Sequence, residues 1–229
     1  MAIRALVFDT FGTLVDWRSG VAREVERLLP GLDGGAFADA WRGRYQPSME
    51  AVRAGARPFA DLDTLQAESL DDLLEAFGHA GVSAAVKREL VLAWHRLDAW
   101  PEVPAAMAEL RQRFVLAPLS NGHVRLIVAL ARRNGLVFDA VLGAGFSRDY
   151  KPKPALYRDA VTALGFAAEE TLMVASHSND LAAAAGEGLS TAHIARPHEN
   201  GPAGGETGPA GPVTFAARDL ADLARQLAG

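Results

Sequence analysis

The chain has 229 residues, of which 49% are apolar, and it carries a formal net charge of −5 at pH 7. This length supports one large domain or two modest ones, and the acidic balance argues against nucleic acid or an anionic membrane as the main partner. The absence of cysteine excludes disulfides, thiolate metal sites and cysteine nucleophiles.

The first predicted element is a strand over residues 4–8, an apolar run that ends directly at Asp9. We expect the chain to lead directly into this strand rather than into a signal sequence, and no apolar run approaches the ~18 residues of a membrane span. We therefore expect a cytoplasmic protein with no membrane partner.

Four amphipathic helical patterns follow the first strand, with no clear strand between them. They cover residues 21–29, 36–49, 61–80 and 84–97. Because this block interrupts the alternation of strands and helices, we expect a helical cap subdomain of residues 17–98. The core domain then consists of residues 1–16 and 99–229.

The rest of the chain alternates between short apolar runs and helical patterns. We expect strands at residues 114–119, 140–142, 171–175 and 191–195, and helices at residues 104–113, 124–134, 154–164 and 180–187. Apolar strands separated by helices predict a doubly wound α/β fold around a parallel sheet. Residues 198–212, rich in glycine and proline, are expected to form a mobile surface loop without a chemical role.

Polar residues follow several of the predicted strands. In an open parallel sheet the loops at the carboxyl ends of the strands line one crevice, where ligands bind. The residues that this rule brings together are Asp9, Ser120, Asn121, Lys151 and residues 176–180. Carboxylate, hydroxyl, amide and ammonium groups are therefore expected to share one site.

Plainer structural roles are open for several of these residues. Ser120 and Asn121 suit a turn before the next helix, and Asn179 or Asp180 suits a helix cap. His177 could be an ordinary loop histidine. Arg42, in the cap, could be a solvated surface cation.

Four segments resemble the motif set of the haloacid dehalogenase superfamily, in the correct order along the chain. They are residues 8–14 (FDTFGTL), 119–122 (LSNG), 150–152 (YKP) and 176–180 (SHSND). The resemblance implies a Rossmann-like sheet with a helical cap that closes over the site. Most of that superfamily are Mg²⁺-dependent phosphatases, which have a general-acid aspartate two residues after the nucleophile and further acidic residues in the last motif.

This chain departs from the phosphatase pattern at two places. Phe11 stands where the general acid is expected, and Asp180 is the only acidic residue of the last motif. The sequence is more similar to the type II branch, the metal-free 2-haloacid dehalogenases. Outside the motifs that similarity extends to Trp41-Arg42, Glu102-Val103-Pro104 and Tyr157.

The resemblance implies an (S)-2-haloacid dehalogenase that removes halide from short 2-haloalkanoic acids, such as haloacetate and L-2-halopropionate, without metal or other cofactor. Asp9 attacks C2 and forms an ester that water then cleaves, giving a 2-hydroxy acid. The implied catalytic residues are Asp9, Lys151, Asp180 and Arg42, and the implied substrate-binding residues are Thr10, Phe11, Ser120, Asn121, Tyr157, Ser176, His177 and Asn179. The branch is often dimeric, so a homodimer is possible.

Individual roles follow from the same resemblance. Lys151 keeps Asp9 ionised, Arg42 and Asn121 receive the halide, and Phe11 forms an apolar wall. Asp180 orients or activates the hydrolytic water. The branch commonly has serine at position 175 and asparagine at position 177, so His177 either replaces that amide or acts as a base. This departure leaves the substrate range open, fluoroacetate included.

Two rival functions stay open at this point. The first is a Mg²⁺-dependent phosphatase acting on a small phosphate ester such as phosphoglycolate. The second is a non-enzymatic member that keeps the fold as a binding module. Assays of halide release and of phosphate release separate these functions.

Overall fold

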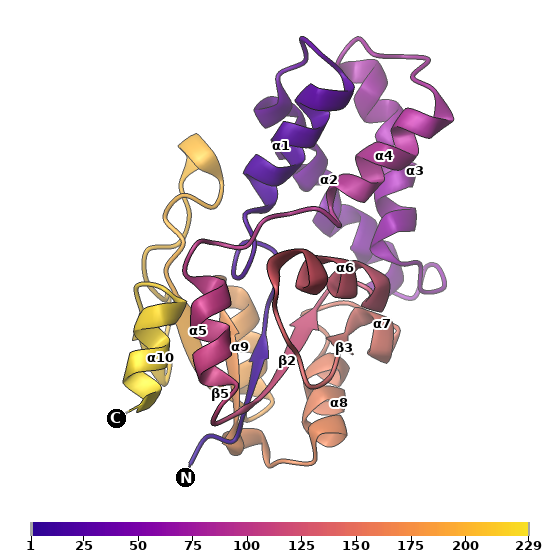
Figure 1. Cartoon of the computed structure of the whole chain (residues 1–229). Coiled ribbons are helices and arrows are strands. Elements are labelled where there is room, and N and C mark those ends of the chain that lie inside the picture. Colours follow the sequence, from indigo (N-terminus) through magenta and orange to yellow (C-terminus); the bar gives the residue numbers. More distant parts are fainter. Residues whose placement is uncertain (1, 229) are drawn as a thin grey trace.

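The computed structural model describes residues 2–228, so the outer limits of the predicted core domain, Met1 and Gly229, lie outside the described residues. Six strands form one parallel sheet in the order β3-β2-β1-β4-β5-β6 (Figure 1). The strands are β1 (Ala5–Phe8), β2 (Val115–Ser120), β3 (Leu142–Gly143), β4 (Thr171–Ala175), β5 (Ser190–Ile194) and β6 (Phe215–Ala217). The expected doubly wound parallel sheet is therefore confirmed.

Alternate residues of β1 face opposite sides of the sheet, because side chains along a strand alternate. Leu6 and Phe8 belong to a core that includes residues of α5 (Val103–Leu110), α6 (Val124–Asn134) and α10 (Leu220–Ala228). Val7 belongs to a second core with α8 (Pro154–Leu164) and α9 (Ser178–Gly186). Both faces are covered, which explains why the strands read as continuous apolar runs.

Four helices form the cap above the carboxyl ends of the strands (Figure 1). They are α1 (Trp17–Leu28), α2 (Gly34–Arg53), α3 (Leu62–Ala76) and α4 (Ala84–Ala93). Each begins after a residue whose side chain accepts a hydrogen bond from a backbone N–H of the first turn, and these residues are Asp16, Asp33, Asp61 and Ser83. Each helix of the cap therefore begins where the sequence supplies an N-cap residue.

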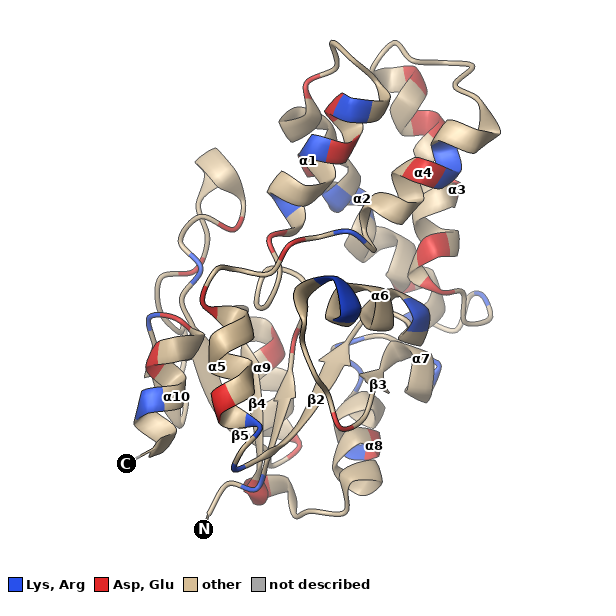
Figure 2. Cartoon of the chain, viewed as in Figure 1, with Lys and Arg blue, Asp and Glu red and all other residues tan. Residues whose placement is uncertain are grey.

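The cap has an aromatic interior. The indole of Trp94 stacks on Trp17 at a centroid distance of 6.2 Å and meets Trp41 edge-on at 5.6 Å. Figure 2 shows charged residues on helices and loops, whereas the described strands carry no lysine, arginine, aspartate or glutamate. In the described part of the chain no helix is both long enough and apolar enough to cross a membrane.

Several predicted limits were wrong in detail. The third strand has only two residues, since α7 (Ala144–Ser147) starts directly after it. Strand β6 was not predicted, because Phe215–Ala217 is a short run at the edge of the sheet. Helix α10 was not predicted either. Helix α2 continues past the predicted end to Arg53 despite Pro47 in its interior.

Candidate active site

A small cavity lies between the cap and the carboxyl ends of β1, β2 and β4. Its volume is about 130 Å³, well below the roughly 300–1,000 Å³ of pockets for drug-sized ligands. Helix α2 and the loops of the core both contribute, and the lining residues are Asp9, Phe11, Arg42, Tyr45, Gln46, Asn121, Lys151, Pro152, His177, Asn179 and Asp180. The cavity lies where the order of the strands reverses around β1, the expected place for a ligand.

Asp9 follows β1, and both of its carboxylate oxygens lie within hydrogen-bond distance of a donor. Its Oδ1 accepts from Lys151 Nζ at 3.1 Å, and its Oδ2 accepts from Thr13 Oγ1 at 2.8 Å and lies 3.1 Å from His177 Nδ1. Burial alone raises the pKa of Asp9, but Lys151 and His177 together lower it well below the usual range. The carboxylate is therefore ionised although it is buried.

Lys151 bridges two carboxylates. Its Nζ donates to Asp9 at 3.1 Å and to Asp180 Oδ2 at 2.6 Å. Burial opposes its charge, yet the two carboxylates raise the pKa of Lys151 above the ordinary value. Tyr157 donates from its hydroxyl to Asp180 Oδ1 at 2.6 Å, and burial beside Asp180 raises the pKa of Tyr157. Lys151 is thus a fixed cation between Asp9 and Asp180.

His177 sits between two carboxylates, one of which the sequence did not predict. Its Nδ1 faces Asp9, and its Nε2 lies 2.9 Å from Oε1 of Glu199. Burial lowers the pKa of the imidazole, but the bonds to Asp9 and Glu199 raise it to about 10. At neutral pH His177 is therefore an imidazolium that donates from both nitrogens.

Glu199 corrects the expectation that residues 198–212 have no chemical role. Its side chain is only 4% exposed, and it also accepts a hydrogen bond from Trp17 Nε1 at 3.1 Å. Gly12, with φ of +87°, makes room for it, because a Cβ there would lie 2.1 Å from Glu199 Oε1. In the same loop, Glu206 accepts from the backbone N–H of Ser178 at 3.0 Å.

Arg42 reaches the cavity from α2 of the cap. Its guanidinium lies 4.1 Å from the ring centroid of Tyr45 and 5.1 Å from that of Trp17. Its Nη1 is buried and has no hydrogen-bond partner within residues 2–228. A buried cationic donor without an acceptor is costly, so this group is positioned to receive an anion.

Phe11 forms an apolar wall of the cavity. Its ring meets Tyr45 edge-on at 6.3 Å and Trp94 edge-on at 6.0 Å, and it is 2% exposed. Phe11 therefore anchors the loop after β1 in the aromatic interior of the cap. The side chain of Phe11 cannot donate a proton.

The structure places some predicted residues behind the cavity instead of on its wall. Ser120 accepts from the backbone N–H of Gly122 at 3.0 Å, so its hydroxyl supports the turn. Ser176 Oγ lies 3.1 Å from Thr13 Oγ1, and Thr10 Oγ1 is buried without a partner among the described residues. These side chains do not line the cavity, and neither does Tyr157.

Asn121 and Asn179 line the cavity and stabilise its loops. Asn121 Oδ1 accepts from the backbone N–H of Lys151 at 2.9 Å, which joins two of the loops. Asn179 Oδ1 accepts from the backbone N–H of Asp180 at 2.9 Å. The N-cap of α9 is His177, whose side chain does not accept a capping hydrogen bond. Capping therefore does not explain Asn179 or Asp180.

Sequence reasoning missed four residues of the site. Tyr45 and Gln46 lie three and four positions after Arg42, on the same face of α2, so helical spacing could have found them. Thr13 lies within the first motif, and Glu199 follows β5, so the strand-end rule points to its loop.

The Mg²⁺ that most of the superfamily use does not fit this donor set. The two carboxylates that could share a divalent cation, Asp9 and Asp180, are both bound by the ammonium of Lys151. A hard cation needs several oxygen ligands, and the side chains of Phe11 and His177 supply none. No step of the reaction is therefore assigned to magnesium.

The fold and the site define the class of the protein: a capped α/β hydrolase with an ionised aspartate at the end of its first strand. Residues 3–188 match the haloacid dehalogenase-like hydrolase family. Over 198 residues, 85% of this chain and 84% of the relative, the chain is 31% identical to the (S)-2-haloacid dehalogenase 4A of Burkholderia cepacia.

Two solved structures extend the comparison. A defluorinating L-2-haloacid dehalogenase is similar with a TM-score of 0.95 and 40% identity, over 99% of this chain and 96% of the other. The L-2-haloacid dehalogenase of Xanthobacter autotrophicus with chloropropionic acid covalently bound has a TM-score of 0.84 and 30% identity, over 99% of both chains. The chain therefore belongs to the haloacid dehalogenase-like hydrolase family, in its L-2-haloacid dehalogenase branch.

Proposed function

We propose that this chain is an (S)-2-haloacid dehalogenase, which converts short 2-haloalkanoic acids and water into 2-hydroxy acids and halide. One observation carries the proposal. The ionised Asp9 faces a small cavity in which Phe11 stands in place of an acid and Arg42 presents an N–H that has no partner among the described residues. Relatives named as 2-haloacid dehalogenases, at 31–40% identity, support it.

In the first step a carboxylate oxygen of Asp9 attacks C2 of the haloacid. A C–O bond forms, the C–X bond breaks, and the halide leaves with the bonding electrons, so no proton donor is needed. The wall formed by Phe11 is compatible with this leaving group and poorly suited to an alkoxide. Arg42 and Asn121 receive the halide in a site largely closed to water, where a guanidinium acts strongly.

In the second step water attacks the carbonyl carbon of the Asp9 ester. The negative charge that develops on the carbonyl oxygen is stabilised by the ammonium of Lys151. We assign acceptance of the water proton to Asp180, because His177 is already protonated at neutral pH. The bond between the Asp9 carbonyl carbon and the oxygen carried by C2 then breaks, and Asp180 returns its proton to that oxygen. The 2-hydroxy acid leaves, and the Asp9 carboxyl group loses its remaining proton to solvent, which regenerates the carboxylate.

The substrate range follows from the small cavity and its donors. A volume of about 130 Å³ suits haloacetates and 2-halopropionates better than longer acids. Fluoride is a poor leaving group that accepts hydrogen bonds strongly, and Arg42 Nη1 is a buried charged donor at this cavity without a partner among the described residues. Together with the defluorinating relative, this donor favours fluoroacetate as a substrate. The homodimer and the cytoplasmic location stay predictions.

A single-turnover experiment in H₂¹⁸O tests the covalent step. With the enzyme in excess over chloroacetate, hydrolysis at the Asp9 carbonyl leaves ¹⁸O in that carboxylate, and mass spectrometry of the peptide that contains Asp9 detects it. Asp9→Asn is expected to release no chloride above about 10⁻³ of the wild-type rate. Chloride release without label in Asp9 contradicts covalent catalysis by this residue.

Assays of chloride release and phosphate release on the same protein distinguish the rival functions. Chloride release from chloroacetate is expected to be unchanged by EDTA, and no phosphate is expected from phosphoglycolate with or without Mg²⁺. Phosphate release that depends on Mg²⁺, without release of any halide, makes the chain a phosphatase. Absence of both activities in folded protein favours a binding module.

A further inference from the structure

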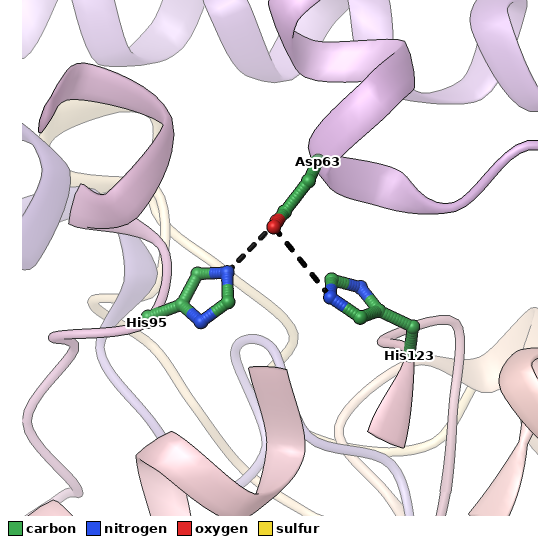
Figure 3. Close-up of side chains that lie close together, drawn as sticks. All are labelled: Asp63, His95 and His123. Carbon is green, nitrogen blue, oxygen red and sulfur yellow. Dashed lines mark hydrogen bonds and ion pairs between the residues drawn. The ribbon is translucent and has the colours of Figure 1, made fainter. Parts of the chain in front are cut away.

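A second polar cluster lies at the boundary between cap and core, apart from the cavity of Asp9. Asp63 comes from α3, His95 follows α4, and His123 is the N-cap of α6 (Figure 3). His95 Nε2 lies 2.8 Å from Asp63 Oδ1, and His123 Nε2 lies 3.6 Å from Asp63 Oδ2. One ligand atom from each of the three residues lies within 4.8 Å of the other two.

His123 is the unusual member of this cluster. It is 8% exposed, and both of its ring nitrogens are buried without a hydrogen-bond partner among the described residues. A buried polar group without a partner costs about 1–3 kcal/mol, so native proteins rarely keep one without a reason.

We propose that Asp63, His95 and His123 form a binding site for a divalent transition metal of the Zn²⁺ type. Two imidazole nitrogens and one carboxylate oxygen are donors that zinc accepts, with a fourth position left for water. Bonds of 2.0–2.1 Å in a tetrahedron place ligand atoms roughly 3.3 Å apart. His95 Nε2 lies 2.8 Å from Oδ1 of Asp63 and His123 Nε2 lies 3.6 Å from Oδ2, distances on either side of that value.

The surroundings leave a path for the ion. Asp63 lines an adjoining pocket of about 380 Å³ that also includes Arg125. Arg125 forms an ion pair with Asp63 Oδ2, but its side chain is 70% exposed, so it can turn into solvent when a metal binds. Displacing an exposed ion pair costs little, since such pairs contribute only ~0–1 kcal/mol.

The site has a consequence for the cap. Asp63 and His95 belong to the helical cap, whereas His123 lies in the core only two residues after Asn121, which lines the active-site cavity. A bound metal therefore ties the cap to the loop after β2. We expect metal binding to stabilise the closed arrangement of cap and core, a role separate from the chemistry at Asp9.

Metal binding is measured directly on the purified, metal-free protein. Equilibrium dialysis with ZnCl₂ is expected to give one ion per chain, and Co²⁺ is expected to show the intense visible absorption of a tetrahedral site. His123→Gln and His95→Gln are each expected to lower the zinc affinity at least tenfold. His79→Gln, a histidine elsewhere in the cap, is the matched control and is expected to bind zinc like the wild type.

Circular dichroism and chloride release of His123→Gln in metal-free buffer establish that this variant is folded. Zinc bound equally well by the wild type and by the His95→Gln/His123→Gln double variant overturns the proposal. Zinc binding that is lost only in His177→Gln also overturns it, because the ion then occupies the active site. If the wild type binds no zinc, the proposal is also overturned.

Discussion

Two polar clusters occupy the boundary between cap and core, and they differ in how fully their histidines are paired. In the active-site cavity, His177 faces Asp9 on one side and Glu199 on the other. In the cluster of Asp63, His95 and His123, the ring of His123 has no partner within hydrogen-bond distance in the described part of the chain. Complete pairing fixes the charges needed for a reaction, whereas incomplete pairing leaves capacity to bind a ligand.

The charges of the first cluster also balance before substrate enters. Three carboxylates face three cationic groups around this cavity: Asp9, Asp180 and Glu199, and Arg42, Lys151 and His177. A haloacid adds one negative charge on its own carboxylate, and when the ester forms the charge of Asp9 passes to the halide. The Nη1 of Arg42, which has no partner among the described residues, is positioned to receive that halide.

Lys151→Met is expected to have the largest effect. Without the ammonium, Asp9 and Asp180 become buried carboxylates without their shared cation, which is expected to cost about 3–5 kcal/mol in the free energy of unfolding. The rate of chloride release is expected to fall at least ~10³-fold, since Lys151 also stabilises the charge of the second step. Urea unfolding and a chloride assay measure the two effects.

Lys153→Met is the matched control for this prediction, because Lys153 precedes α8 without a side-chain capping bond. It is expected to keep the wild-type rate. A Lys151→Met variant that retains a tenth of the wild-type activity would mean that the paired cluster does not depend on its central cation.

Arg42→Lys is expected to lower kcat/KM for chloroacetate by about 10–100-fold. Lysine keeps the charge but loses the planar group that lies over Tyr45 and Trp17 and presents Nη1 to the cavity. Arg44→Lys, an exposed arginine of the same helix, is the control. Equal kinetics for Arg42→Lys and the wild type would remove Arg42 from the halide site.

The sequence predicted the rim residues well because strand ends can be located from apolar runs. Asp9, Asn121, Lys151 and Asp180 follow strands and meet at one edge of the sheet, as parallel topology requires. The resemblance to a known family identified the cap and the reaction type. Both conclusions depend on local patterns or motif order, which a single sequence contains.

The strand-end rule points to the loop that contains Glu199, but it does not predict the contacts that set the charges. Glu199 lies in a glycine-rich segment that has no apolar pattern, and its contact with His177 depends on how the chain returns to the sheet after β5. The approach of Asp63 to His123 joins residues from cap and core. Such contacts are properties of tertiary packing and leave no periodic pattern in the sequence.

Glu199→Gln is expected to have an intermediate effect. It removes one of the two carboxylates that raise the pKa of His177 to about 10. A hydrogen bond to a charged group contributes roughly 1.5–3 kcal/mol, so chloride release is expected to fall about tenfold or more. Glu169→Gln, at an exposed position, is the control.

The pH dependence of stability gives the more specific test of this pair. Because the folded pKa of His177 lies above the unfolded value of ~6.5, its stabilising contribution is complete below pH ~6.5 and is lost as the pH rises toward 10. The wild type should therefore lose stability over that range, and Glu199→Gln should lose less. Parallel profiles for the two proteins would contradict the pairing of His177 with Glu199.

His123→Leu is expected to have the smallest effect in metal-free buffer, and its sign is the informative part. Replacing a buried polar group that has no partner by an apolar one is neutral or stabilising, so urea unfolding should show an unchanged or slightly higher free energy, by up to ~1 kcal/mol. The same change at His177 leaves Asp9 and Glu199 without their shared donor and should destabilise the protein. If His123→Leu loses more than ~1 kcal/mol without metal, its ring has a partner in the folded protein and the two clusters are equally paired. If it loses nothing, the ring of His123 is retained in this chain for a reason other than the stability of the metal-free fold.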